Sequence, residues 1–209
     1  MTAHLRMGFF WLAMTLGSLV GLCADPITDK IKTSHHCVAY TERVGDFSQT
    51  MTIESWRSSD RFRLERTADG EKTVTIGMSN EIYRYIEGEK RGKKLTPKAY
   101  RALAHTSLRM EDPLRLMLWV RDQGKKIGTA TVENTECDQY QLDEQAGMVT
   151  YVWLSHAAFL PVKITTQSAD GRTALTFLYK TIEINPKIED RLLTPPSDVV
   201  FEETSDSAP

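Results

Sequence analysis

His35, His36 and Cys37 are the residues of this sequence whose types first suggest chemistry, because histidine and cysteine are ligands of zinc and other transition metals. They are consecutive and begin a segment with the pattern of a β-strand. Neighbouring strand residues point to opposite faces of a sheet, so the three side chains do not easily converge on one ion. His105 and His156 add no recognisable ligand spacing. The pattern favours exposed histidines beside a structural cysteine, and no metal is expected.

Motifs that position catalytic or phosphate-binding groups are missing from the sequence. It has no G-x-S-x-G, P-loop, G-x-G-x-x-G, H-E-x-x-H or C-x-x-C. Acidic residues such as Glu54 and Glu65 occupy positions expected to face solvent, so paired catalytic carboxylates cannot be identified. We therefore expect a protein that is not an enzyme and holds no cofactor. A hydrolase with an unrecognised site is the competing hypothesis.

One basic cluster, KRGKK at residues 90–94, is followed by Lys98 and Arg101. Such a cluster could bind anionic head groups or an acidic partner. The alternative is a solvated hairpin tip. The whole chain has 26 basic and 28 acidic residues and a formal net charge of −2. This balance argues against general nucleic-acid binding, which requires a strongly positive surface.

The first 24 residues have the pattern of a secretory signal peptide. Arg6 precedes a nearly uncharged apolar stretch from Met7 to Leu22, which is short and poorly flanked for a membrane-spanning helix. Cleavage after Cys23 or Ala24 would release a soluble protein into the periplasm. Two alternatives are an acylated Cys23 that anchors a lipoprotein and an uncleaved anchor.

Removal of the signal peptide after Cys23 would leave two cysteines, Cys37 and Cys137. In an oxidising compartment two such thiols most often pair, so the sequence predicts a Cys37–Cys137 disulfide. Two buried free thiols are the alternative.

Most of the chain beyond the signal peptide alternates as β-strands do. In residues 61–66, for example, Phe62 and Leu64 alternate with charged residues, which is typical of a sheet with one buried face. Gly45-Asp46, Asp69-Gly70 and Asp170-Gly171 mark turns. About ten strands in one large antiparallel sheet are predicted, at residues 36–44, 47–56, 61–66, 73–78, 80–86, 128–133, 140–143, 148–154, 161–167 and 173–184.

Two helices interrupt the strands. Thr96-Pro97 and Asp112-Pro113 each combine a good N-cap residue with a proline in the first turn, which predicts helices over residues 97–108 and from Pro113 to about Gln123. In the second helix the apolar residues Leu114, Met117 and Leu118 share a face with Arg121. Further apolar residues surround that face, so the helix is either sandwiched or covers an apolar cavity.

Residues 148–154 and 173–179 are apolar on both faces, whereas an open antiparallel sheet normally keeps one face wet. Either helices cover the sheet, or one face lines an apolar ligand cavity. Without an internal repeat or linker, residues 25–202 are expected to form a single domain. Residues 203–209 are expected to be a disordered acidic tail.

Several segments, in order, resemble the LolA/LolB-like family of outer-membrane lipoprotein carriers. Residues 34–44 (SHHCVAYTERV) resemble its first strand, and Trp56-Arg57 followed by RFRLE at 61–65 resembles its Trp/basic strand. Residues 113–120 resemble its apolar lid helix. The late segments 152–162 (VWLSHAAFLPV) and 193–199 (LTPPSDV) complete the set.

This resemblance implies a mainly β (α+β) fold, an incomplete antiparallel β-barrel with a helical lid that holds acyl chains of lipids or lipoproteins. The family's lid-contacting arginine aligns with Ser58, beside Arg57, and the contact is assigned to Arg57. Alternation and lid position then select the residues expected to line the cavity: Phe62, Leu64, Val74, Ile76, Leu114, Met117, Leu118, Val152, Leu154, Leu175 and Phe177.

The predicted function is therefore a periplasmic, monomeric carrier or binding protein for acyl chains, with an inner- or outer-membrane protein as a possible partner. The same fold hosts sensors of the cell envelope. The alternative is accordingly a regulatory module that binds a membrane protein stably instead of delivering cargo.

Overall fold

The computed structural model of the protein describes residues 31–97, 113–145 and 147–204. The predicted signal peptide and the predicted helix over 97–108, apart from its first residue, lie outside these ranges. So do residues 205–209 of the predicted tail. Within the described ranges no helix combines the length and the apolar character needed to cross a bilayer.

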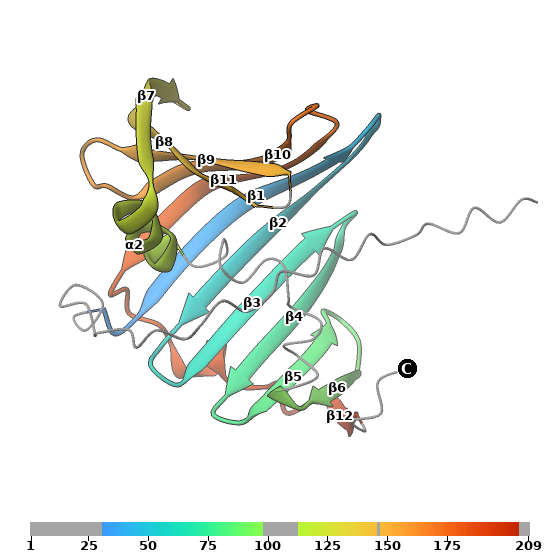
Figure 1. Cartoon of the computed structure of the whole chain (residues 1–209). Helices are drawn as coiled ribbons and strands as arrows, with labels where there is room; N and C mark the ends of the chain where they lie inside the picture. The colour runs from blue at the N-terminus through green and yellow to red at the C-terminus, as the bar shows by residue number, and fades with distance from the viewer. Residues whose placement is uncertain (1–30, 98–112, 146, 205–209) are drawn as a thin grey trace, which may run out of the picture.

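Twelve strands of the described chain form one open sheet that is not closed into a barrel (Figure 1). Its order is β12-β6-β5-β4-β3-β2-β1-β11-β10-β9-β8-β7. Neighbours are antiparallel except β12 and β6, which are parallel. The strands are β1 (Ser34–Val44), β2 (Phe47–Arg57), β3 (Arg61–Ala68), β4 (Glu71–Met78), β5 (Glu81–Ile86), β6 (Arg91–Leu95), β7 (Lys125–Val132), β8 (Thr135–Gln145), β9 (Met148–Ser155), β10 (Pro161–Ser168), β11 (Thr173–Ile184) and β12 (Val200–Glu203).

All ten predicted strands are present, and the turns between them follow the expected chemistry. Asp69 and Gly70, which join β3 to β4, have φ angles of 51° and 81°. Two positive φ angles match the twist of the flanking strands, and Asp-Gly tolerates them well. The predicted mainly-β fold, an incomplete barrel with a helix over its sheet, is confirmed.

Two strands were not predicted, β6 and β12. β6 is the basic cluster, which was interpreted as a hairpin tip or an anion-binding patch. It forms a strand because it pairs with β5 on one side and β12 on the other. Lys90 and Arg91 face the carboxylates of Asp198 and Glu202. Acidic residues of the same chain thus partner the cluster, and Glu203 belongs to a strand instead of a disordered tail.

The helix α2 (Pro113–Gln123) covers one face of the sheet, which we call the inner face, and packs on β8 and β10 (Figure 1). Its Leu116 and Val120 are fully buried and enter the main hydrophobic core. That core also contains Val38, Ile53 and Leu64 of the inner face. These facts confirm the predicted second helix.

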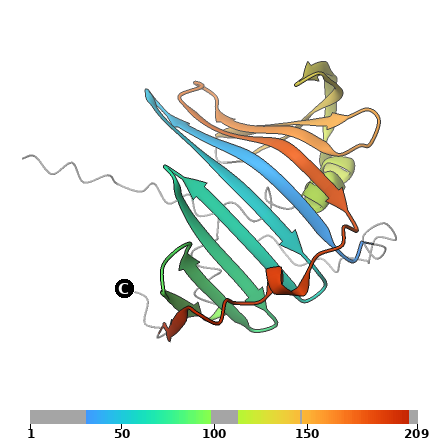
Figure 2. The same cartoon turned by 180° about the vertical axis from the view of Figure 1, so that it is seen from behind.

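The opposite, outer face is crossed by the segment that follows β11. This segment, residues 185–199, includes the short 3₁₀ helix η2 (Asp190–Leu193), which packs on β3 and β4, and it leads to β12 at the sheet edge (Figure 2). We call it the C-terminal strap. Its Leu193 is buried. Both faces of the sheet are therefore covered in part, one by a helix and the other by an extended segment.

Candidate functional site

The residues predicted to line one cavity lie in three different places. Strand pairing decides which face each occupies, because directly paired residues of antiparallel neighbours project to the same face. Six of them lie together on the inner face: Phe62, Leu64, Val152, Leu154, Leu175 and Phe177.

These inner-face residues pack around the buried side of α2. Leu64, Val152, Leu154 and Phe177 belong to the same core cluster as Leu116. Phe62 and Leu175 are only partly buried and lie at the margin of this cluster. Beneath α2 the inner face is therefore a packed core. Half-buried apolar side chains, including Phe62 and Leu175, surround this core on the same face.

Val74 and Ile76 lie on the outer face, not with Phe62 and Leu64. Val74 pairs with Glu65 and Ile76 with Arg63, whereas the partner of Leu64 in β4 is Thr75. Both are nevertheless fully buried, with no exposed area. The C-terminal strap packs on this part of the outer face, so the apolar residues of β4 face the strap and not α2.

The predicted face of α2 lines an apolar pocket of about 280 Å³. Leu114, Met117 and Leu118 lie in its wall, and Arg121 is the charged residue among the lining side chains. The other walls come from the β9–β10 connection, the end of β11 and the residues before β1: Ala158, Phe159, Leu160, Ile184 and Ile31. The volume lies just below the usual range for ligand sites, about 300–1,000 Å³.

Five lining residues of this α2 pocket, those outside the helix, were not anticipated from the sequence. Phe159 and Ile184 are large apolar side chains with 36% and 44% of their area exposed. Phe159 has a φ of 54° in the β9–β10 connection. An apolar residue in a turn was a usable signal, because turns are normally polar. Nothing in the sequence shows that Ile184 and Ile31 approach α2.

Arg57, the predicted lid contact, lies on the inner face beside Phe62, with which it pairs. Its guanidinium carbon is 5.7 Å from the centroid of the Phe62 ring, within the range of a cation–π interaction. Among the described residues its buried Nε has no hydrogen-bond partner, and neither has the buried Oγ of Ser55 two residues earlier. No contact seen among the described residues joins Arg57 to α2, so the lid contact stays a prediction.

The predicted Cys37–Cys137 disulfide is not seen in this structure. Cys37 and Cys137 are free thiols on β1 and β8. Three strands separate β1 from β8, so four inter-strand steps of about 4.8 Å put the cysteines about 19 Å apart along the sheet. A disulfide requires Cα atoms within about 7 Å. The count of cysteines suggested a pair, but the strand order separates them.

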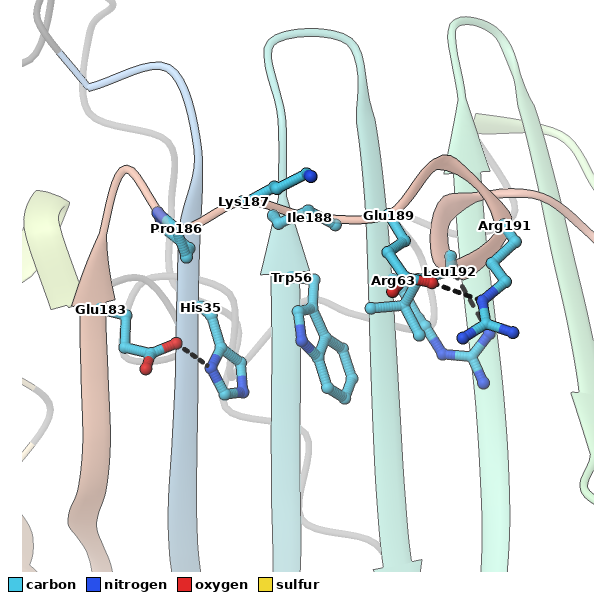
Figure 3. Close-up of a pocket in the computed structure, with 10 residues that line it drawn as sticks. All are labelled: His35, Trp56, Arg63, Glu183, Pro186, Lys187, Ile188, Glu189, Arg191 and Leu192. Atoms are coloured by element: carbon cyan, nitrogen blue, oxygen red, sulfur yellow. Dashed lines mark hydrogen bonds and ion pairs between the residues drawn. The ribbon is translucent and has the colours of Figure 1, made fainter.

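A second pocket, of about 520 Å³, lies on the outer face between the sheet and the C-terminal strap. Figure 3 shows His35, Trp56 and Arg63 side by side on three neighbouring strands, with residues 186–192 of the strap passing across them. The His35 ring stacks on Trp56 with centroids 5.0 Å apart and an interplanar angle of 8°.

Most charged groups of this outer pocket have ion-pair partners. The two His35 ring nitrogens lie 2.8 Å from a Glu183 carboxylate oxygen and 3.0 Å from one of Glu54. The Nε of Arg63 donates to Glu65 at 2.6 Å, and its Nη1 donates to the Leu192 carbonyl. The bond to Leu192 attaches the strap to the sheet, and the other contacts join neighbouring side chains of the sheet. The arrangement is a set of polar contacts at the boundary between the sheet and the strap.

His36 and Cys37, which follow His35, lie on opposite faces of the sheet, and Cys37 shares the outer face with His35. His36 is buried on the inner face and pairs with Ser55, whereas Cys37 pairs with Glu54 on the outer face. In the described ranges no group of three or more His, Cys, Asp or Glu side chains could hold a metal ion. Adjacent side chains of the three point to opposite faces, as predicted, whereas His35 and Cys37 share the outer face.

Comparisons with solved structures concern the fold. The crystal structure of an uncharacterized conserved protein from Thermus thermophilus matches 85% of this chain and 93% of its own, with 10% identity and a TM-score of 0.56. Pseudomonas aeruginosa MucB, in its complex with MucA, matches 81% of this chain and 58% of its own (15% identity, TM-score 0.48). A LolA superfamily protein from Nitrosomonas europaea matches 79% and 91% (9% identity, TM-score 0.37).

The chain shares its fold with the Thermus protein. LolA superfamily proteins, the family that the sequence resembles, are among the solved structures similar to it. No protein-family model and no curated protein matches the sequence. At identities of 9–15% these similarities do not carry an activity, so the function is argued from the geometry.

Proposed function

We propose that the protein binds an acyl chain of a lipid or lipoprotein in the α2 pocket and carries it within the periplasm of a bacterial envelope. The observation that carries the proposal is the lining of this pocket, which is apolar apart from Arg121. The signal-like first 24 residues and the sequence resemblance to lipoprotein carriers support it. The pocket is formed by α2 and by loops at one end of the sheet, not by the packed core.

The affinity would come from removing alkyl groups from water. Each buried CH₂ contributes about 0.8 kcal/mol, so a segment of six to eight methylenes gives roughly 5–6 kcal/mol before the cost of ordering the chain. The half-buried inner-face residues Tyr40, Met51 and Leu175 lie beside the core and offer further apolar contact. A longer chain could use them.

A second candidate function, binding of a membrane-protein partner, is favoured by the tip of the β1–β2 hairpin. Val44 and Phe47 pair directly there and are 50% and 55% exposed. Exposed apolar pairs at a hairpin tip can mark a protein-interaction site. Val44→Ser with Phe47→Ser should leave acyl-chain binding unchanged, and would weaken association with such a partner.

The α2 pocket can be tested with two aspartate substitutions on one helix. Leu118→Asp should keep the fold, because Leu118 is half-buried at the pocket, but it should reduce binding of the neutral apolar dye N-phenyl-1-naphthylamine at least about tenfold. Leu116→Asp places a carboxylate in the core, where Leu116 is 1% exposed, and should unfold the protein.

Thermal melting of both variants measures whether each still folds, and dye titration measures whether the α2 pocket is the binding site. Unfolding of Leu118→Asp would show that this side of the helix is core. Dye binding by Leu118→Asp as tight as that of the parent protein would show that the pocket is not the binding site.

A further inference from the structure

Two polar side chains interrupt the apolar inner face at one end of β2. Ser55 is 1% exposed, and its Oγ lacks a hydrogen-bond partner within the described part of the chain. The same is true of the buried Nε of Arg57. The two residues are two positions apart on a strand, so they share a face and lie about 7 Å apart along it. A buried polar atom without a hydrogen-bond partner costs free energy, and a polar group of a bound ligand would remove that cost.

The charge of Arg57 points to the nature of that group. Arg61 and Arg63 of the neighbouring strand have carboxylate partners, Asp190 at 2.8 Å and Glu65 at 2.6 Å. No ion pair of Arg57 occurs among the described residues, where its contact is the ring of Phe62. A half-buried guanidinium is best compensated by an oxyanion, which accepts two parallel N–H hydrogen bonds from it.

Strand pairing connects this polar site with the α2 pocket. Ile184 pairs with Ser34 and Ser34 pairs with Arg57, so the three residues form one row across β11, β1 and β2 on the inner face. Two inter-strand steps separate Ile184 from Arg57, about 10 Å. Ile184 lines the α2 pocket. An apolar pocket and a cation thus lie on one face at a spacing that one amphiphile can span.

We propose that Arg57 and Ser55 bind the oxyanion head group of an amphiphile whose acyl chain occupies the α2 pocket. The guanidinium of Arg57 donates to the oxyanion, and the Ser55 hydroxyl donates a further hydrogen bond. The inference rests on the proposed function and adds the ligand class: single-chain lipids with a carboxylate or phosphate head group, in preference to neutral lipids of equal length.

Displacement of N-phenyl-1-naphthylamine from the full chain tests this preference. Laurate, dodecyl phosphate and 1-dodecanol have the same chain length and different head groups. The parent protein should bind at least one of the two anions about tenfold or more tighter than 1-dodecanol, as expected for charge-assisted hydrogen bonds. Tighter binding of laurate identifies a carboxylate head group, and tighter binding of dodecyl phosphate a phosphate.

Substitutions then assign the preference to its residues. Arg57→Met should abolish the difference between anion and alcohol and leave the affinity for 1-dodecanol within about twofold. Arg57→Lys should retain part of the preference for anions over 1-dodecanol that Arg57→Met loses. Ser55→Ala should reduce this preference. Arg43→Met is the matched control, because Arg43 is exposed on the outer-face side of β1, where it pairs with Ala174.

Melting temperatures separate binding from folding. Arg57→Met and Ser55→Ala each remove a buried polar atom without a hydrogen-bond partner in the described structure, and the apolar Met side chain can still pack on the Phe62 ring, so neither variant should melt clearly below the parent protein. An anion-to-alcohol ratio that Arg57→Met leaves unchanged, or a parent protein without preference, would overturn the inference and leave the acyl-chain pocket intact. Failure of the dye and all three lipids to bind would instead overturn the proposed function, and the inference with it.

Discussion

Cys37 and Cys137 show how burial decides the behaviour of single residues. Burial, with a smaller contribution from the nearby Glu54 carboxylate, raises the pKa of the Cys37 thiol. Burial also raises the pKa of the Cys137 thiol. The thiolate is the reactive form, so a raised pKa leaves less of it near neutral pH. Both residues therefore behave as structural thiols in the native protein.

This leads to a labelling prediction. A thiol reagent at pH ~8 should modify both cysteines of the folded protein at least about tenfold more slowly than those of the denatured protein, with Cys137 the slower because it is fully buried. Peptide mass spectrometry assigns the label to each cysteine, and Cys37→Ser provides the control. Denatured, unreduced protein that takes up no label on either residue would contradict the free-thiol structure.

At the scale of elements, the alternation in β3 predicted the correct face and the alternation in β4 did not. Phe62 and Leu64 alternate with Arg63 and Glu65, and the charged residues indicate which face is more polar. In β4 the alternating apolar residues, Val74 and Ile76, could face either way. The pairing register decides which face Val74 and Ile76 occupy. The sequence of β4 does not show that its outer face is covered by η2, more than 100 residues later in the chain.

The edge strands depend on contacts that only the folded chain makes. β6 contains Gly92, over which the Phe201 ring of β12 lies, so a Cβ there would be 2.7 Å from a ring atom. Tyr83 and Tyr85 of β5 meet the same ring edge-on, with centroids 5.0 and 6.0 Å away. A glycine within a strand often indicates that another group packs closely against the backbone. The sequence does not identify that group as Phe201, which is more than 100 residues away.

Phe201 should accordingly anchor the whole end of the strap. Phe201→Ala removes a partly buried ring and should destabilise the protein by about 1–2 kcal/mol, less than the roughly 3–5 kcal/mol of a fully buried phenylalanine. It should also speed proteolytic cleavage within residues 194–204. Val200→Ala, in the same strand but 67% exposed, should change neither. Denaturant titration and limited proteolysis with mass spectrometry measure both effects; equal behaviour of the two variants would contradict the anchoring role.

At the scale of the whole molecule, two pockets of the described structure lie on opposite faces of one sheet. The outer pocket lies under the strap, and most of its charged side chains have ion-pair partners. The α2 pocket lies on the inner face, with an apolar wall. Composition and alternation indicated an apolar cavity and a helix over the sheet. They could not divide the apolar residues between two covered faces, because both faces of the sheet are buried in part.

Ligand binding at the α2 pocket should stabilise the whole fold. α2 packs on β8 and β10, and the pocket also contacts the end of β11, so a bound chain links the helix to the sheet. A ligand that binds only the folded state adds about 2.7 kcal/mol to the free energy of unfolding at a concentration of about 100 times its Kd. Laurate below its micelle concentration should therefore raise the melting temperature of the parent protein in a concentration-dependent way. Leu118→Asp should show little or no rise, whereas Val44→Ser, at the distant hairpin tip, should show the full rise. A rise of equal size in Leu118→Asp would place the bound chain elsewhere on the molecule.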